Sequence, residues 1–373
     1  MSTESNKHLV IACGGTGGHF FPTLAIARAF CNMGNRVSML VAGAHADEQL
    51  KIAADNGFEA LEAPAVRGPQ GIVDAAFFPF RMLSSIRTAR HLILSLNPDV
   101  MLGMGSYASL PACLAVPKRI PLVLHEGNAF MGKTNRIMAR KAKAIGLSLP
   151  LEHEEQLHGA RGVLVGMPLR EQIIKAAANP EYDADYVKSL GLVPGVATVL
   201  VFGGSQGARR INELFTETAP LMTPHSDKIQ FIHLTGTDDN AALKEAYETA
   251  GVRASIRRAE QSIEKCYTAA DLVVCRGGAS SLCELALFGK PAVIIPLPTA
   301  ADDHQSSNAR LAQSIGGAIW QPQSEATPSK MSGYLLELIN DRTHFSEMGK
   351  KLQTLSRANA AEEMAKLLLE YSK

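Results

Sequence analysis

The sequence predicts an α/β protein with two Rossmann-like, doubly wound domains. Short apolar runs rich in β-branched residues alternate with amphipathic segments, a pattern typical of βαβ units. The runs are apolar throughout, so helices are expected to cover both faces of each parallel sheet. The segments LVIACGGTGGH (9–19) and VLVFGGSQGAR (199–209) share a strand, a glycine turn and a helix start, so each is expected to open one domain.

The domain boundary is expected near residue 165, around the segment RGVLVGMPLR. We expect an N-terminal domain over 1–165, a C-terminal domain over 166–345, and a final helix within 346–373 that packs back on the first domain. Pro79 is expected in the first turn of a helix. The expected helices include Pro22–Met33, Pro79–Leu96 and Ile211–Leu221. The expected strands are Leu9–Cys13, Val37–Val41, Val100–Met104, Leu122–His125, Val163–Val165, Val199–Phe202, Ile229–Leu234, Leu272–Cys275 and Ala292–Pro296.

The composition is that of a globular protein. The chain has 373 residues, which corresponds to about two domains. Hydrophobic residues make up 46% and charged residues 20%, which argues against disorder and against a disulfide scaffold. The six cysteines lack the spacing of zinc ligands, so we expect reduced thiols and no metal site. The sequence shows neither a signal-peptide pattern nor an apolar run long enough to span a membrane, so a cytoplasmic location is expected.

Positive charge is concentrated in one part of the chain. Between Arg67 and Lys143, eleven basic residues outnumber three acidic ones, Asp74, Asp99 and Glu126. The net charge of the whole chain is only +1, so no general affinity for nucleic acid is expected. The local excess predicts an anionic surface or substrate near the first half.

The first glycine turn, residues 14–19, is a candidate phosphate site. A strand that leads through glycines into a helix exposes backbone N–H groups at a helix N-terminus, which suits a diphosphate. Phe20 stands where the dinucleotide fingerprint needs its third glycine, so binding of NAD is disfavoured. A tight turn with a buried histidine is the structural alternative. His19, at the end of the turn, is a candidate to accept a proton.

The segment Gly127–Thr134 matches the GxxxxGK[ST] pattern of P-loop nucleotide hydrolases. It lies behind several βα units, and no other apolar strand ends in the aspartate that would hold Mg²⁺. The P-loop interpretation is therefore disfavoured. The segment just before it, His125–Asn128, is more informative, because ligand-binding side chains collect at the carboxyl ends of parallel strands.

Three motifs in the second half complete the pattern. The glycine turn at 203–208 carries Ser205, whose hydroxyl suits a phosphate. In the segment 275–284, Ser280 and Ser281 are expected at a helix N-terminus, which favours an anion, and Glu284 suits two ribose hydroxyls. The segment 302–309 could read sugar hydroxyls, although its two aspartates are equally explained as helix caps.

Taken in order, these motifs resemble one known family. GGTGGHFFP, GMGSYASLP, LHEGN, GMPLR, GGSQGAR, CRGGASSLCE and HQSSNA follow one another from about residue 9 to the C-terminal helix. This order is similar to that of the MurG family of undecaprenyldiphospho-muramoylpentapeptide β-N-acetylglucosaminyltransferases. The resemblance implies a GT-B fold, in which two Rossmann-like domains face each other across a cleft.

The resemblance also implies a donor site for UDP-N-acetylglucosamine (UDP-GlcNAc), mainly on the C-terminal domain. It implies Glu284 at the ribose, Gln305 and Asn128 at the sugar, and the Ala279 backbone at the uracil. A second uracil contact, just before the family's YxxAD segment, maps near Glu260. The residues that the resemblance implies around UDP-GlcNAc are Thr16, Gly17, Gly18, Asn128, Arg170, Ser205, Glu260, Ala279, Ser280, Ser281, Leu282, Cys283, Glu284 and Gln305.

Four positions depart from the family pattern. Gly127 stands where Gln is usual, Met167 where Asn is usual and Gly277 where Ser is common, and Ser280 replaces an apolar residue. None of these departures removes a charged group. They bear on the details of the pocket rather than on the activity.

The implied reaction is an inverting glycosyl transfer. The C4 hydroxyl of the muramoyl sugar of lipid I attacks C1 of the donor, UDP leaves, and a β-1,4 bond gives lipid II, the peptidoglycan precursor. The attacking hydroxyl needs a base, for which His19 is the first candidate and Glu126 the second. Glycine turns and helix N-termini can stabilise the leaving diphosphate, so neither a metal nor a cofactor is expected.

The lipid-linked acceptor implies contact with a bilayer. We expect the enzyme to be peripheral on the cytoplasmic face of the bacterial inner membrane, bound to an anionic surface. Other proteins of cell-wall synthesis are further candidate partners. The alternative is that the aromatic residues of this segment, Phe77 and Phe80, simply belong to the apolar core. The residues expected at the membrane are Ile72, Val73, Phe77, Phe80, Arg81, Arg87 and Arg90, while Met82, Ile86 and Ile93 are expected to pack inward.

Three alternatives explain the same motifs differently. A UDP-GlcNAc epimerase shares the fold and the donor but needs no lipid acceptor. A P-loop hydrolase would use Lys133 for Mg-ATP. A non-catalytic sensor of sugar nucleotides would bind the donor and release no UDP when lipid I is added.

Overall fold

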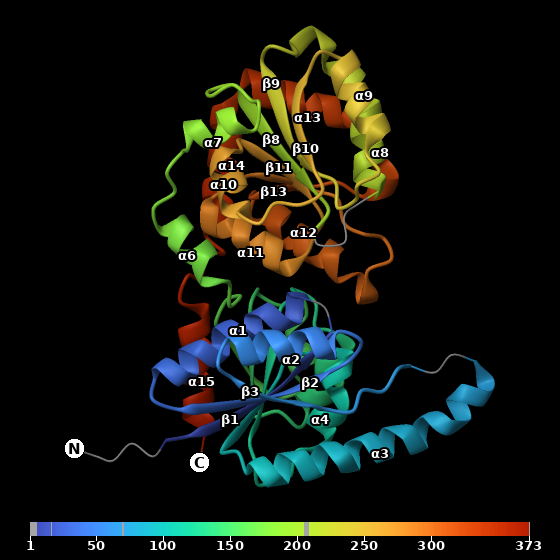
Figure 1. Cartoon of the computed structure of the whole chain (residues 1–373), viewed down its shortest axis with the longest axis vertical. Coiled ribbons are helices and arrows are strands. Elements are labelled where there is room, and N and C mark those ends of the chain that lie inside the picture. Colours follow the sequence, from blue (N-terminus) through green and yellow to red (C-terminus); the bar gives the residue numbers. More distant parts are fainter. Residues whose placement is uncertain (1–5, 16, 69–70, 205–208, 373) are drawn as a thin grey trace. The chain divides into compact units, whose positions relative to one another are not determined.

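The computed structural model describes residues 6–372 except 16, 69–70 and 205–208, and it leaves out the side chains of Ile72 and Val73. The chain divides into two compact units (Figure 1). Unit 1 comprises residues 1–170 and 357–373, and unit 2 comprises residues 171–356. Each unit has its own parallel sheet, as the alternation of apolar runs and amphipathic segments predicts.

Unit 1 contains a seven-stranded sheet in the order β3-β2-β1-β4-β5-β6-β7, and every pair in it is parallel. Because the strands are parallel, the carboxyl ends of β1, β4 and β5 lie at the same edge. Its strands are β1 (His8–Gly14), β2 (Arg36–Ala42), β3 (Glu59–Glu62), β4 (Val100–Gly103), β5 (Leu122–Glu126), β6 (Ala144–Leu147) and β7 (Arg161–Leu164). Its helices are α1 (Gly17–Asn32), α2 (Ala46–Asp55), α3 (Ile72–Leu96), α4 (Leu110–Ala115), α5 (Lys133–Ala139) and α15 (Ala360–Tyr371).

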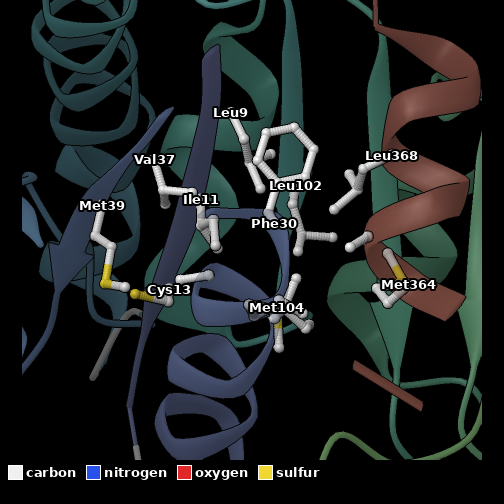
Figure 2. Packing of buried hydrophobic residues seen from close by; sticks show 14 of the residues in the cluster. Leu9, Ile11, Cys13, Phe30, Val37, Met39, Leu102, Met104, Met364 and Leu368 are labelled. Carbon is white, nitrogen blue, oxygen red and sulfur yellow. The ribbon is translucent and has the colours of Figure 1, made fainter. Parts of the chain in front are cut away.

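The C-terminal helix α15 completes the core of unit 1. Figure 2 shows Met364 and Leu368 of α15 beside Leu102 of β4 and Phe30 of α1. All four side chains are fully buried. Burying one such side chain stabilises a fold by about 1.5–3 kcal/mol, so α15 is a structural part of unit 1 rather than an appendage.

The segment 346–373, which we expected to form one final helix, contains parts of two. Helix α14 (Arg342–Gln353) belongs to unit 2, and α15 belongs to unit 1. Leu352 of α14 is buried in unit 2, and Met364 is buried in unit 1. The chain leaves one core for the other between them, so a single rigid helix could not serve both.

Two helices begin earlier than expected. In each of them, a proline that we expected near the first turn lies well inside the helix. Helix α1 begins at Gly17, ahead of Pro22, and α3 begins at Ile72, ahead of Pro79. A proline inside a helix removes one N–H and leaves the carbonyl four residues earlier without its helical donor. The residues that carry those carbonyls, Gly18 and Ala75, are exposed, so water can replace the missing donor.

Helix α3 packs on the sheet through its C-terminal half. Ile93 is fully buried, and Met82 and Ile86 pack partly buried against the same cluster, which confirms the inward-facing set. Phe77 and Phe80 are 61% and 71% exposed, so a core role for these two rings is excluded. Figure 1 shows the N-terminal half of α3 projecting from the sheet of unit 1. Among the described residues, no helix combines the length and apolarity that a membrane crossing requires.

Unit 2 contains a six-stranded parallel sheet in the order β10-β9-β8-β11-β12-β13. Its strands are β8 (Ala197–Phe202), β9 (Ile229–Leu234), β10 (Arg253–Arg257), β11 (Leu272–Cys275), β12 (Ala292–Ile294) and β13 (Ala318–Trp320). Its helices are α6 (Glu171–Ala178), α7 (Ala184–Ser189), α8 (Arg209–Thr218), α9 (Ala241–Thr249), α10 (Ile263–Ala269), α11 (Ala279–Phe288), α12 (His304–Ser314), α13 (Pro328–Asn340) and α14.

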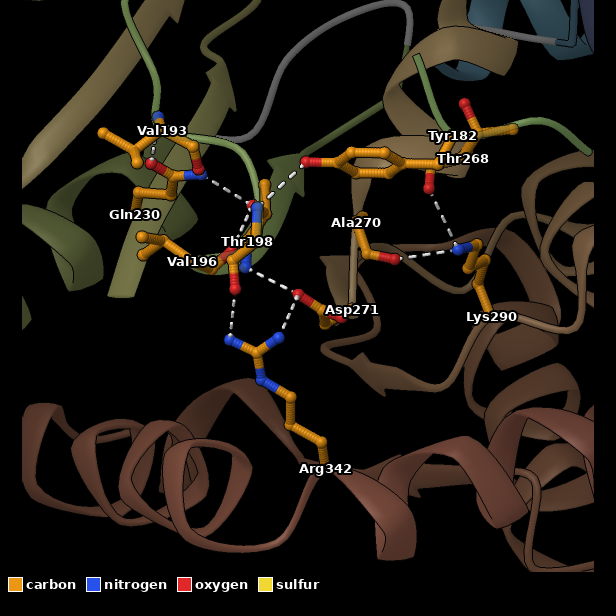
Figure 3. A network of polar contacts seen from close by, with 11 residues as sticks. Tyr182, Val193, Val196, Thr198, Gln230, Thr268, Ala270, Asp271, Lys290 and Arg342 are labelled. Atoms are coloured by element: carbon orange, nitrogen blue, oxygen red, sulfur yellow. Dashed lines mark hydrogen bonds and ion pairs between the residues drawn. The ribbon is translucent and has the colours of Figure 1, made fainter. Parts of the chain in front are cut away.

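A polar network holds the amino ends of the unit 2 strands together (Figure 3). The Asp271 carboxylate accepts from the Thr198 N–H at 2.8 Å and pairs with Arg342 of α14 at 4.0 Å. The Lys290 ammonium donates to the Ala270 carbonyl oxygen at 2.9 Å, and burial lowers its pKa. These contacts fix β8, β11 and the end of α10 at the amino edge of the sheet. The glycine turns lie at the opposite, carboxyl edge.

Candidate active site

The glycine turn after β1 is set by a close approach of two strands. Gly14 has φ 138°, and a Cβ there would collide with the Ala42 carbonyl oxygen at the end of β2. The next carbonyl oxygen, that of Gly15, accepts from the Gln49 side-chain amide at 2.8 Å. Only glycine permits this path, which leads directly into α1 at Gly17. Thr16 lies outside the described residues.

His19 lies in the first turn of α1 and joins the turn after β1 to the turn after β4. Its Nδ1 is 2.9 Å from the carbonyl oxygen of Met104, and a carbonyl oxygen can only accept. Nδ1 therefore carries the proton, and Nε2 is the basic atom of the neutral ring. The side chain is half-buried. His19 thus has the tautomer that a general base requires.

Glu126 ends β5 and is 3% exposed. Its Oε1 accepts from the Asn128 N–H at 3.0 Å and from the Asn128 side-chain amide at 3.2 Å. Its Oε2 accepts from the Gly132 N–H and from the Asn135 side-chain amide, both at 2.9 Å. Four donors occupy the carboxylate, so its geometry is that of an anchor for the loop 127–132.

The same contacts account for the P-loop-like sequence. The Gly132 N–H, which a P-loop would turn toward phosphate, donates to Glu126. The loop does bring backbone amides to an anion, but that anion is a carboxylate of the chain itself. Lys133 begins the seven-residue helix α5. The contacts of Gly132 and Glu126 therefore disfavour the P-loop alternative.

His125, next to Glu126, is buried and neutral. Burial, with a smaller contribution from the charge of His19, lowers the pKa of His125 to about 4. Its Nε2 is 3.0 Å from Ser148 Oγ, and its carbonyl oxygen accepts from Asn135.

Acid is expected to destabilise unit 1 through His125. An unfolded chain protonates this histidine below pH 6.5, whereas the folded chain does so only near pH 4, so the free energy of unfolding falls as the pH drops through this window. Between pH 7 and pH 5 the loss is about 2 kcal/mol. Urea denaturation at these two pH values measures it. In His125→Gln the pH dependence should shrink, and an unchanged slope in that variant would contradict the assignment.

In unit 2, the helix N-terminus that follows β11 is the main candidate for binding an anion. Helix α11 begins at Ala279, and its first intrahelical bond runs from the Leu282 N–H to the Gly278 carbonyl oxygen at 2.9 Å. The N–H groups of Ala279, Ser280 and Ser281 therefore remain available to a ligand. Ser280 and Ser281 lie in the first turn, as expected. Leu282 and Cys283 point into the core, so their side chains cannot serve the site.

The turn before α11 packs tightly against the start of α12. A Cβ at Gly277 would collide with the Gln305 carbonyl oxygen, and the buried Asn308 side chain donates to the Gly277 carbonyl oxygen at 2.9 Å. This contact leaves no room for a side chain at position 277 in this protein. The Gln305 side-chain oxygen accepts from the Leu297 N–H at 2.9 Å, so its NH₂ group is presented as the donor.

The remaining candidates differ in what they can offer. Glu260 accepts from Arg257, Tyr186 and the Ser262 N–H, so its carboxylate is occupied by the protein. Ser205 lies outside the described residues, and Arg170 is the last residue of the first segment of unit 1. Asp303 occupies the N-cap position of α12, as the capping alternative suggests, but its side chain makes no capping hydrogen bond.

No metal site accompanies these features within the described ranges, where no group of three or more His, Cys, Asp or Glu side chains is placed to hold an ion.

Three residues that make polar contacts behind the site were not among the sequence-based candidates. They are Asn135, Asn308 and Tyr267. Tyr267 donates to Glu284 at 2.7 Å. Asn308 lies in the quoted motif HQSSNA, and Tyr267 opens the segment YTAAD that matches YxxAD, so both had a sequence signal.

Two parallel-sheet units, each with a glycine turn at the carboxyl edge of its sheet, are the architecture of the GT-B fold. The Glycosyltransferase family 28 N-terminal domain matches residues 9–147, and the Glycosyltransferase family 28 C-terminal domain matches residues 198–364. The crystal structure of Acinetobacter baumannii MurG aligns with a TM-score of 0.78 at 27% identity and covers 98% of this chain and 99% of its own.

Curated relatives carry one name, UDP-N-acetylglucosamine–N-acetylmuramyl-(pentapeptide) pyrophosphoryl-undecaprenol N-acetylglucosamine transferase. The Shewanella baltica (strain OS185) protein is 34% identical over 97% of both chains. The Verminephrobacter eiseniae protein is 37% identical over 96% of this chain and 97% of its own. The chain belongs to this transferase family within glycosyltransferase family 28. A UDP-GlcNAc 2-epimerase from Neisseria meningitidis is 12% identical with a TM-score of 0.67 and shares the fold alone.

Proposed function

We propose that this enzyme transfers N-acetylglucosamine from UDP-GlcNAc to the C4 hydroxyl of the muramoyl sugar of lipid I, forming lipid II with inversion at C1. The observation that carries the proposal is the 34% identity, over 97% of both lengths, to a transferase named for this reaction. The epimerase alternative lacks such support, because its solved example shares only the fold.

The unit 2 site suits the donor. At the N-terminus of α11, the N–H groups of Ala279, Ser280 and Ser281 can donate to the diphosphate. Negative charge grows on the diphosphate as UDP leaves, so these donors would stabilise the transition state. Glu284 lies in the second turn of α11, and its carboxylate would accept hydrogen bonds from the ribose hydroxyls. The Gln305 NH₂ group can donate to a sugar oxygen. Leu282 and Cys283 contribute only to the packing of this helix.

We assign the general base to His19 rather than to Glu126. His19 has its proton fixed on Nδ1, so Nε2 can accept the proton of the attacking hydroxyl. Glu126 already accepts four hydrogen bonds. If its carboxylate took up a proton, the new O–H group would face an N–H donor, and a hydrogen bond would be lost. Glu126 then holds the loop that carries Asn128, which is implied at the donor sugar.

The reaction itself is tested with radiolabelled UDP-GlcNAc and a soluble lipid I analogue in the presence of EDTA. We expect labelled disaccharide product and stoichiometric UDP, with no loss of rate when the chelator is added. Consumption of UDP-GlcNAc without the acceptor would point to the epimerase instead. Failure to release UDP with both substrates present would leave a binding protein and overturn the proposal.

The acceptor carries a lipid, and α3 offers a surface that suits a bilayer. Phe77 and Phe80 project from its N-terminal half, and the exposed Arg87 adds positive charge. Arg81 pairs with Asp74 at 2.7 Å, and Arg90 approaches the Ala115 carbonyl oxygen at 3.5 Å, so these two arginines are less available than the sequence suggests. We place the enzyme peripherally on the cytoplasmic face of the inner membrane, where other cell-wall synthesis proteins act.

Changing both Phe77 and Phe80 to serine is expected to weaken binding to anionic vesicles by at least about 30-fold, because two exposed rings no longer enter the interface. Flotation with phosphatidylglycerol liposomes measures the bound fraction. Leu221→Ser, which removes an apolar side chain that is 48% exposed in unit 2, serves as the control. Equal flotation of the double variant and the wild type would refute the α3 surface.

A further inference from the structure

Tyr267 lies behind the unit 2 site and is almost completely buried. It belongs to α10 and is 1% exposed. Its ring packs against Phe202, the last residue of β8, and against Phe288 of α11, with ring centroids 6.3 Å and 5.3 Å apart. These contacts hold the ring between the sheet and α11, so the direction of its hydroxyl is fixed by packing.

The Tyr267 hydroxyl donates to Glu284 Oε2 at 2.7 Å. The bond crosses from α10 to α11, so the carboxylate is held by a neighbouring helix rather than by its own. Glu284 is half-buried, whereas Tyr267 is buried, which places the donor on the protein side of the carboxylate. Burial and the Glu284 charge raise the pKa of Tyr267, so its hydroxyl keeps its proton throughout the working pH range.

We propose that Tyr267 is a positioning residue that fixes the Glu284 carboxylate in the orientation that accepts the ribose hydroxyls of a nucleoside diphosphate. The inference rests on the proposed donor site. A glutamate on a helix surface has three rotatable side-chain bonds, and ordering it at the moment of binding weakens affinity. Tyr267 orders it beforehand, so the carboxylate is ready when UDP arrives.

The competing explanation is that Glu284 merely satisfies a buried hydroxyl. The two explanations differ in what the ribose contributes. If Tyr267 positions Glu284, its loss matters only for ligands whose ribose hydroxyls reach the carboxylate. If the bond is only structural, its loss affects every nucleotide equally.

The test measures binding of UDP and of 2′,3′-dideoxyuridine diphosphate to the full-length enzyme by calorimetry. Tyr267→Phe keeps the ring and removes only the hydroxyl. It is expected to weaken UDP by about tenfold, the loss of one charge-assisted hydrogen bond, and to change the dideoxy analogue by less than about twofold. Glu284→Gln should weaken UDP as well, and the double variant should be no weaker than Glu284→Gln alone.

Tyr247→Phe is the matched control. Tyr247 is also buried in unit 2, and its hydroxyl lies 3.2 Å from His233 Nδ1, so this variant loses a comparable contact away from α11. Its affinity for UDP should equal that of the wild type. Melting curves of all variants report folding.

The other outcomes overturn the inference in distinguishable ways. Normal UDP binding by Tyr267→Phe, with weak binding by Glu284→Gln, would reject the positioning role and keep the donor site. Equal weakening of both nucleotides by Tyr267→Phe would show a general packing role and also reject it. Normal UDP binding by Glu284→Gln would remove the proposed ribose contact itself, and the positioning role with it.

Discussion

Replacing His19 by alanine is expected to lower kcat by about 10²–10⁴-fold while the KM for UDP-GlcNAc changes by less than about twofold. The physical reason is the fixed tautomer. Met104 accepts the Nδ1 proton, so Nε2 is the atom that can take the proton of the attacking hydroxyl. The groups on α11 that we propose to bind the donor belong to the other unit and are untouched. Initial rates at saturating lipid I analogue, with UDP-GlcNAc varied, separate the two constants.

His45→Ala is the matched control for this experiment. His45 is an exposed histidine in the same unit, and its side chain makes no capping bond to α2. The control should therefore turn over at the wild-type rate. A wild-type rate in His19→Ala would remove His19 from the base role, and an increase in KM alone would assign it to donor binding.

Replacing Glu126 by glutamine is expected to destabilise unit 1 by about 3 kcal/mol. An amide has one acceptor oxygen and two N–H groups, so at least one of the four donors around position 126 then meets another donor. Scanning calorimetry should show the transition of unit 1 lowered by about 10 °C. Below that temperature, kcat should stay within about tenfold of the wild type, because the base is elsewhere.

Glu48→Gln provides the comparison, since Glu48 is an exposed carboxylate in the same unit. It should melt with the wild type. If Glu126→Gln instead melted normally and lost more than about 10²-fold in kcat, Glu126 would be the base and His19 its assistant.

The central strands could be predicted from sequence because burial on both faces makes them continuously apolar. Strands β1, β8 and β11 are fully buried, and each was expected within three residues of its ends. Four strands were missed. Strands β3 and β10 lie at sheet edges and mix polar residues with apolar ones, and β13 is an edge strand of only three residues. Strand β6 (AIGL) is buried, but it holds one β-branched residue and a glycine, so its sequence does not favour a strand over another apolar segment.

The site divides in the same way. The glycine turns were predictable because strand, turn and helix start are contiguous in the sequence. The contacts behind them were not, because they join distant segments. Asn135 reaches Glu126 across a loop, and Asn308 reaches Gly277 from another helix. Nothing local in the sequence says that Glu126 is encircled by donors, which is why it remained a candidate base.

Unit 1 is discontinuous in the chain, and this fixes the order in which the protein can fold during synthesis. Residues 171–356 form a contiguous unit that can fold while the rest is still being translated. The core of unit 1 must wait for Met364 and Leu368, which leave the ribosome after the whole of unit 2. Chains cut short between residues 356 and 364 would therefore have a complete second unit and an incomplete first unit. Such chains expose apolar strands and are targets for chaperones and proteases.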